Sequence, residues 1–290
     1  MSELFDTHCH VHEIETALTP VHDKWHGDNK VRTAESVLEA AHAAGITRLI
    51  VIGTTLEDSQ IAADFAAKHE NVWAAIGLHP HEAKNYTTPQ KTTIKGLSSK
   101  TSKTRSLRIL PEVSARFQEL ITQPKVVAVG ECGLDYFYEH SPKADQEVVL
   151  RFQMELALEH DLPISFHVRE AFDDFWRIFE SYKGVRGVLH SFTDSLENME
   201  RAIECGLYIG VNGIATFTKD ETQLVTYRTI PQRSLLLETD APFLTPKPFR
   251  GTICEPKHIV HTAEFLAELR GESLDTLATT TSANAERLFL

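Results

Sequence analysis

The sequence predicts an α/β protein of one domain, residues 1–290, folded as a TIM-like (β/α)8 barrel. Short apolar or β-branched runs alternate eight times with longer amphipathic segments along the chain. Several of the short runs, such as "RLIVIG" and "VVAVGE", are apolar at nearly every position, which is typical of strands buried on both faces. The length of 290 residues suits one barrel, which typically needs about 250.

The predicted strands are, in chain order, Leu4–His8, Arg48–Gly53, Val72–Gly77, Val126–Glu131, Pro163–His167, Gly187–His190, Leu207–Val211 and Leu235–Glu238. The predicted helices are Ala34–Ala44, Ser59–Lys68, Pro111–Thr122, Ala144–His160, Ala171–Tyr182, Leu196–Cys205, Lys257–Leu269 and Asp275–Phe289. The clearest helix is Ala144–His160, because Val149, Phe152 and Leu156 recur at three- and four-residue spacing. A doubly wound open sheet is the alternative, but no Gly-rich dinucleotide fingerprint follows the first strand.

Composition limits the class of protein. With 42% hydrophobic and 24% charged residues, the chain has ordinary globular composition. The net charge of −12 argues against a protein that coats nucleic acid, but allows an enzyme that engages a few phosphates at a cationic site. No apolar run approaches the roughly 18 residues of a membrane span, and the N-terminus lacks the basic region of a signal peptide.

The cysteines indicate the compartment. The sequence contains no CxxC pair, and we expect reduced thiols that act as small buried side chains at Cys9, Cys132, Cys205 and Cys254. A cytoplasmic location is therefore predicted, or a nuclear one in a eukaryote.

Residues 84–108 interrupt the alternation of strands and helices. The segment "KNYTTPQKTTIKGLSSKTSKTRSLR" has seven Lys and Arg residues and no Asp or Glu. We expect this basic, Ser/Thr-rich insertion to be a mobile surface loop. The alternative is a basic flap that contacts phosphates beside the site.

Ionisable side chains follow six of the eight predicted strands at the end where catalytic residues of β/α barrels gather. They are His8 and His10, His79 and His81, Glu131 and Asp135, His167 and Arg169, His190, and Glu238 and Asp240. Burying so many ionisable groups costs several kcal/mol each unless they are paired or bound to metal. The strand ends therefore predict one shared functional site.

The residue types at these strand ends favour a metal. His8 and His10 share one face of a strand, and neutral imidazole is the commonest metal ligand. Mixed imidazole and carboxylate ligands suit Zn²⁺, Mn²⁺ or Fe²⁺ better than Mg²⁺ or Ca²⁺. The sequence shows no set of thiolate ligands, so it does not predict a closed structural zinc site. Four histidines and two carboxylates exceed what one ion needs. Two ions about 3.5–4 Å apart that share a carboxylate would use them all and could activate a water for displacement at phosphorus.

Taken together, these residues resemble the amidohydrolase-type metal-dependent hydrolase barrels, and within them the TatD family of metal-dependent deoxyribonucleases. The matching segments follow in order over nearly the whole chain, except for residues 84–108. They are "DTHCH", "GLHPHEA", "AVGECGLDYF", "LPISFHVREAF", "HSFT", "YIGVNGIATF", "LLLETDAPFLTP" and "TSANAERLF".

The resemblance implies a barrel that hydrolyses phosphodiester bonds in DNA as a 3′-to-5′ exonuclease on single strands, through a water activated by two divalent ions. It leaves the ion open among Zn²⁺, Mn²⁺ and Mg²⁺. The residues that match the family's metal ligands are His8, His10, Glu131, His167, His190 and Asp240. Of these, Glu131 resembles the shared carboxylate, and Asp240 would also accept the proton of the nucleophilic water.

The resemblance also suggests which residues contact substrate. The "HPH" element and "FRG" match positions near the substrate phosphate, and Arg169 adds a cation, so the expected substrate-binding residues are His79, His81, Arg169 and Arg250. Glu238 would either hold a ligand imidazole in place or act directly.

Some positions depart from the family pattern and leave the choice of substrate open. His12 and Cys254 stand where Asp and Asn are common, and "DYFYEH" lacks an Arg that often follows the tyrosines. We expect single-stranded DNA or DNA ends as the partner, with RNA as an alternative, and no membrane. The sequence leaves the oligomeric state open and is compatible with a monomer. The alternatives are an ester or amide hydrolase on the same scaffold, such as a D-aminoacyl-tRNA deacylase, and a non-catalytic metal- or nucleic-acid-binding module.

Overall fold

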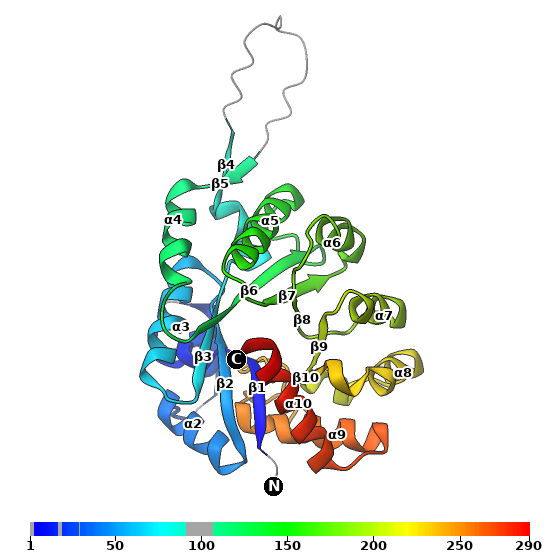
Figure 1. The fold of residues 1–290 in the computed structure, drawn as a ribbon. Helices are drawn as coiled ribbons and strands as arrows, with labels where there is room; N and C mark the ends of the chain where they lie inside the picture. The colour runs from blue at the N-terminus through cyan, green and yellow to red at the C-terminus, as the bar shows by residue number, and fades with distance from the viewer. Residues whose placement is uncertain (1–2, 17–18, 29, 91–106) are drawn as a thin grey trace, which may run out of the picture.

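A computed structural model describes residues 3–16, 19–28, 30–90 and 107–290, which form a nearly closed barrel of eight parallel strands (Figure 1). The strands of this sheet are β1 (Leu4–Cys9), β2 (Ile46–Ile52), β3 (Val72–Ile76), β6 (Val126–Asp135), β7 (Ile164–Arg169), β8 (Gly187–Leu189), β9 (Tyr208–Val211) and β10 (Leu235–Leu237). They lie side by side in chain order, as repeated β-α units require. The prediction of a TIM-like barrel in one domain is confirmed, with all eight predicted strands present.

The helices cover the outside of the sheet (Figure 1). They are α1 (Pro20–Trp25), α2 (Ala34–Ala43), α3 (Leu56–Lys68), α4 (Pro111–Leu120), α5 (Lys143–Glu159), α6 (Phe172–Phe179), α7 (Leu196–Glu204), α8 (Glu221–Thr229), α9 (Ile259–Arg270) and α10 (Leu274–Phe289). Short 3-10 helices are η1 (Val11–Glu15), η2 (Pro80–Asn85), η3 (Gly213–Phe217), η4 (Gln232–Ser234) and η5 (Pro256–His258). In the part of the chain that the structure describes, none of the helices combines the length and apolar character that crossing a membrane would demand.

Two α-helices lie outside the predicted set, α1 and α8. In α8 only Thr226 and Tyr227 are buried, so its sequence "ETQLVTYRT" shows no apolar stripe at helical spacing. In α1, which is six residues long, only Trp25 is buried. Both helices are stabilised by their place in the fold, which leaves no periodic signal in the sequence.

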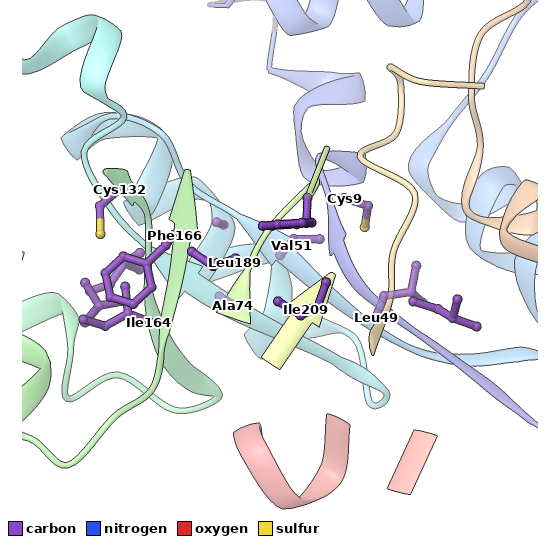
Figure 2. Packing of buried hydrophobic residues seen from close by; sticks show 14 of the residues in the cluster. Cys9, Leu49, Val51, Ala74, Cys132, Ile164, Phe166, Leu189 and Ile209 are labelled. Carbon is purple, nitrogen blue, oxygen red and sulfur yellow. The ribbon is translucent and has the colours of Figure 1, made fainter. Parts of the chain in front are cut away.

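The strands are buried on both faces, as their apolar sequences predict. In β2, Leu49 and Val51 belong to the large cluster between sheet and helices, which Figure 2 shows with side chains from several neighbouring strands. The alternate residues Ile50 and Ile52 belong to a second cluster, against which the last turns of α10 pack with Leu288 and Phe289. This double burial holds the carboxyl ends of the strands in a fixed arrangement.

The four cysteines are free thiols. Three of them, Cys9, Cys132 and Cys254, are fully buried, and Cys205 is half-buried. Burial raises the pKa of the Cys132 thiol, so this group stays protonated. The expectation of small buried side chains holds for all but Cys205.

Strand β6 runs four residues beyond its predicted end at Glu131, and it therefore carries both Glu131 and Asp135. It lies against β7 with Gly133 beside His167. A Cβ atom at Gly133 would come within 1.8 Å of the His167 carbonyl oxygen, so only glycine permits this approach. The close approach brings the polar ends of β6 and β7 together.

The ends of the basic insertion form a two-stranded antiparallel sheet, β4 (Thr87–Pro89) with β5 (Leu107–Ile109), which projects beyond the barrel (Figure 1). Residues 91–106, which carry most of the charge, lie outside the described residues. The loop and flap interpretations of residues 84–108 therefore both stay predictions.

The barrel closes where β1 meets the segment after β10. The Asp6 carboxylate accepts hydrogen bonds from the Thr239 backbone N–H (2.9 Å) and the Thr239 hydroxyl (2.5 Å). The Thr7 hydroxyl donates to the Leu237 carbonyl at 3.0 Å, and the Asp240 N–H donates to the His8 carbonyl at 2.8 Å. Asp6 is fully buried, so its hydrogen bonds have no competition from water.

Replacing Asp6 tests this closure. We expect Asp6→Ala to lower the free energy of unfolding by about 2–4 kcal/mol, because it leaves buried donors on Thr239 unpaired. Burial raises the pKa of Asp6 to about 7, so a neutral side chain of the same shape suits the position. Asp6→Asn should therefore cost roughly 1 kcal/mol or less. Urea denaturation checks both variants, and an equal loss in the two would contradict the hydrogen-bond explanation.

Candidate metal centre

The predicted strand-end residues converge on the carboxylate of Glu131. Its Oε1 lies 2.7 Å from His167 Nδ1, 3.4 Å from His79 Nε2 and 3.8 Å from His190 Nε2. Its Oε2 lies 3.4 Å from His8 Nε2. Four imidazoles from four different strand ends thus surround one buried carboxylate, although the nearest pair in sequence is separated by 23 residues (167 to 190).

A second carboxylate, Asp240, lies close to His8 and His10. Its Oδ1 is 3.5 Å from His10 Nε2 and 3.7 Å from His8 Nε2. The same nitrogen of His8, Nε2, therefore faces the carboxylates of both Glu131 and Asp240. Its buried Nε2 has no hydrogen-bond partner among the described residues, which is costly unless another group occupies the space in front of it.

The donor atoms fall into groups that suit divalent ions. Three sets have one donor atom per residue, all within 4.8 Å of one another: His8 with Glu131 and His190, His8 with His10 and Asp240, and His79 with Glu131 and His167. Each set mixes imidazole nitrogen with carboxylate oxygen, as Zn²⁺ and Mn²⁺ sites do. The unpartnered His8 Nε2 belongs to two of the sets, so the residues present fit a bound metal.

Two of these imidazoles are oriented by groups behind them. His10 Nδ1–H donates to the Ile52 carbonyl at 3.0 Å, which directs Nε2 toward Asp240. His190 Nδ1 forms an ion pair with Glu238 Oε1 at 2.9 Å, which turns its Nε2 toward Glu131. Such partners fix the ring and its tautomer in metal sites. Glu238 thus contacts one imidazole of the cluster, and its role in holding a metal ligand in place stays a prediction.

Glu238 is itself held by two hydrogen bonds. Its Oε1 accepts from the Ser191 backbone N–H at 2.6 Å and from Asn212 Nδ2 at 3.2 Å. Neither Ser191 nor Asn212 was identified from the sequence, although Asn212 lies in the "YIGVNG" motif at the end of β9. The motif at the end of β9 thus contributes to the site through the contact of Asn212 with Glu238.

Asp135 has a larger role than the sequence indicated. Its Oδ2 accepts from His81 Nε2 at 2.9 Å and from His167 Nε2 at 3.0 Å. His167 is therefore held between two carboxylates, Glu131 and Asp135. The sequence places the Asp of "GECGLDY" among the strand-end acids, and its two imidazole partners show that it also orients His81 and His167.

The carboxylates of the cluster stay ionised despite their burial. Burial by itself would raise the pKa of Glu131, but the surrounding imidazoles of His79, His190 and His167 hold that pKa well below its usual range. Burial acts on Asp240 in the same sense, and the hydrogen bond from His10 lowers its pKa below the ordinary value.

The imidazoles split into two kinds. Burial would lower the pKa of every one, but neighbouring carboxylates raise the pKa of His10 and His167 to about 9 and that of His190 to about 10. For His8 and His79 burial prevails, and the pKa of His79 falls to about 4. Without metal, the positive charge on protonated His10, His167 and His190 offsets the negative charge of the carboxylates. A bound cation would replace those protons.

The structure separates the predicted substrate-binding residues. His79 lies within the cluster beside Glu131. His81 contacts the neighbouring carboxylate of Asp135 instead of Glu131. The Arg169 guanidinium lies over the rings of Phe137 and Tyr138, and the Arg250 guanidinium lies 5.0 Å from the centre of the Phe217 ring. Neither arginine forms an ion pair with a described member of the cluster.

The fold and the cluster define a barrel of the metal-dependent hydrolase class, and comparison with known proteins identifies the family. The chain belongs to the TatD-related DNases, whose family model matches residues 5–290. It is 34% identical over 290 residues to the uncharacterized metal-dependent hydrolase YabD of Bacillus subtilis, covering 99% of this chain and 98% of that protein. It is 33% identical over 266 residues to the 3′-5′ ssDNA/RNA exonuclease TatD of Escherichia coli K12, covering 88% of this chain and 92% of that protein.

Solved structures agree with this membership. The TatD homologue YjjV of Escherichia coli superposes with a TM-score of 0.78 at 29% identity and covers 99% of this chain and 97% of its own. A TatD-family hydrolase of Entamoeba histolytica gives a TM-score of 0.79 at 22% identity, with 100% and 99% covered, and supports the fold alone. The resemblance seen in the sequence is confirmed, and the protein is a metal-dependent hydrolase that acts on ester bonds.

Changing Glu238 tests how the cluster is oriented. We expect Glu238→Gln to weaken metal binding about 10- to 100-fold, because His190 loses the anion that fixes its ring. Calorimetric titration of chelator-treated protein with Zn²⁺ or Mn²⁺ measures the affinity. Glu35→Gln, an exposed change on α2, is the matched control. Equal affinity in the two variants would contradict a positioning role for Glu238.

Proposed function

We propose that this protein is a nuclease that hydrolyses phosphodiester bonds of single-stranded DNA, removing nucleotides from the 3′ end, with RNA as a further substrate. The observation that carries the proposal is the buried set of imidazoles and carboxylates around the unpartnered His8 Nε2. Membership of the TatD-related DNases supports phosphodiester chemistry. The polarity and the single-stranded substrate rest on relatives named as 3′-5′ ssDNA/RNA exonucleases.

In this proposal the cluster holds two divalent ions. The proposed ligands are His8, His10, Glu131, His167, His190 and Asp240, and Glu131 would be the carboxylate that the two ions share. The donor set favours Zn²⁺ or Mn²⁺ over Mg²⁺. When bound, such ions supply a nucleophilic water at neutral pH and neutralise charge on the phosphate.

Asp240 is the proposed proton acceptor. It is half-buried, its pKa lies below the ordinary value, and it lies beside His8 and His10 just after the last strand, β10. A carboxylate in this position can take the proton of the attacking water, since it is the acid of the cluster with the more exposed side chain, 16% against 6% for Glu131.

The remaining polar residues are proposed to position the substrate phosphate. His81 is half-buried and fixed through its Nε2 on Asp135, and the exposed Arg169 and Arg250 add positive charge near the strand ends. His79 is neutral at physiological pH, because burial lowers its pKa to about 4, so it can either ligate a cation or hydrogen-bond to the substrate.

Metal reconstitution tests the proposed function. Protein stripped with chelator is supplied with Zn²⁺, Mn²⁺ or Mg²⁺ singly and incubated with 5′-labelled single-stranded DNA. We expect a ladder of shortened products that depends on metal, as digestion from the 3′ end produces. An immediate jump to mononucleotide would reverse the polarity. Bound metal without any cleavage would exclude the nuclease and favour ester or amide hydrolysis, with D-aminoacyl-tRNA tested next.

The shared carboxylate gives a sharper version of this assay. We expect Glu131→Gln to lower kcat/KM at least about 100-fold with a near-native circular dichroism spectrum, because it removes charge at nearly constant volume. Metal content measured on the same sample should fall as well. Turnover at the wild-type rate would contradict the assignment of Glu131.

Asp240→Asn separates chemistry from binding. If Asp240 accepts the proton, the variant should lose kcat by about 100-fold or more with a small change in KM. An equal loss in substrate affinity would instead indicate that Asp240 acts mainly in holding the site together. The comparison is made at saturating metal so that a weakened ion site does not imitate lost catalysis.

A further inference from the structure

Two exposed aromatic residues stand on the loop that follows β6, directly after Asp135. Phe137 is 50% exposed and Tyr138 is 49% exposed, and no other Phe, Tyr or Trp among the described residues is as open to solvent. Large aromatic side chains normally bury most of their surface. Their exposure at the end of the barrel that carries the cluster therefore calls for a ligand-based explanation.

The loop that carries these rings is fixed to the cluster. The backbone N–H groups of Phe137 and Tyr138 both donate to Asp135 Oδ1, each at 3.0 Å. The other oxygen of the same carboxylate accepts from His81 and His167. One buried side chain thus sets the positions of the two rings and of two site histidines.

Arg169, at the end of the neighbouring strand β7, places its guanidinium over both rings. Its guanidinium carbon lies 4.1 Å from the centre of the Phe137 ring and 4.7 Å from that of Tyr138. It forms no ion pair with any described carboxylate, so its charge is available to a phosphate. The Tyr136 N–H donates to the Arg169 carbonyl at 3.0 Å, which ties the arginine to the same loop.

The rings themselves form an open corner. Phe137 and Tyr138 have centroids 4.8 Å apart and planes at 88° to each other. On its other side Tyr138 stacks on His140, with centroids 5.6 Å apart and planes at 9°. The edge of His81 approaches Tyr138 at 5.5 Å. These contacts leave about half of each aromatic surface uncovered within a defined geometry.

We propose that Phe137, Tyr138 and Arg169 form an aromatic platform on which the nucleobase next to the hydrolysed bond stacks. The inference rests on the proposed nuclease function and names the part of the substrate that this surface reads. Flat rings beside an unpaired cation are what single-stranded nucleic acid binds, because every base offers a π-face and every linkage a phosphate. A base stacked on protein has left its helical neighbours, so the aromatic platform selects unpaired ends.

Binding of a hydrolysis-resistant probe tests the aromatic platform without requiring turnover. The probe is a phosphorothioate-linked (dT)8 strand with 2-aminopurine at its 3′ end, added to Mn²⁺-loaded protein. Stacking quenches 2-aminopurine fluorescence, and we expect wild-type protein to quench it. The double variant Phe137→Ala/Tyr138→Ala should lose the quenching and bind about 5- to 150-fold more weakly, the range measured for loss of one stacked base.

Two controls keep the result specific. The exchange Phe137→Tyr/Tyr138→Phe retains both rings and should bind like wild type, because stacking tolerates either ring. Leu158→Ala removes an exposed apolar side chain on α5 and should change nothing. Because Phe137 and Tyr138 are exposed, the Ala variants should melt within a few degrees of wild type, which a thermal scan verifies.

Each outcome is decisive. Absence of quenching by wild-type protein, or wild-type affinity and quenching in the double Ala variant, would overturn the aromatic platform whether or not the protein cleaves DNA. Quenching by wild type that is lost in the double variant would support it. A protein that quenches the probe but cleaves no DNA with any metal would retain the platform and lose the nuclease assignment.

Discussion

The Glu131 carboxylate, buried among four imidazoles, is the interaction on which the rest of the site depends. An anion without water around it is stable only when positive charge or hydrogen-bond donors surround it. Here the positive charge comes from His167 on β7 and His190 after β8, whose pKa values are raised, and His8 and His79 complete the ring of imidazoles. The contact holds the separate strand ends together at a single point. It also makes the space between Glu131 and Asp240 negative and lined with nitrogen donors, which is an environment that favours a divalent cation.

The Asp135 carboxylate positions residues at the edge of the cluster. Glu131 and Asp135 lie four residues apart on β6, and His167 contacts both. Asp135 also accepts hydrogen bonds from the backbone N–H groups of Phe137 and Tyr138. The same carboxylate therefore positions both the cluster histidines and these two exposed rings. The close packing of β6 and β7 at Gly133 makes this possible, since any side chain there would separate the two strands.

Barrel closure and the site are built from the same segments. Asp6 and Thr239 close the barrel two residues before His8 and one residue before Asp240. Two departures from the family pattern, His12 and Cys254, are buried. His12 donates through Nε2 to Asp58 at 2.9 Å, and Cys254 is enclosed in the core. Both positions thus have a structural place in this chain that leaves the donor set intact.

The sequence by itself determined the eight strands, the barrel and the residues of the cluster. Short continuous apolar runs that alternate with amphipathic segments favour parallel strands buried on both faces, and the carboxyl ends of such strands gather at one end of a barrel. Tertiary structure decided what those residues contact. Asp135 orients His81 and His167, His79 joins Glu131, and Arg169 turns to two aromatic rings, all across separations of about 30 to 55 residues. The formation of helix α8 likewise depends on its packing in the folded protein, because its own sequence carries no apolar stripe. Periodicity encodes which face of an element is buried, whereas the choice of partner depends on the register and close approach of different strands, which only the folded chain defines.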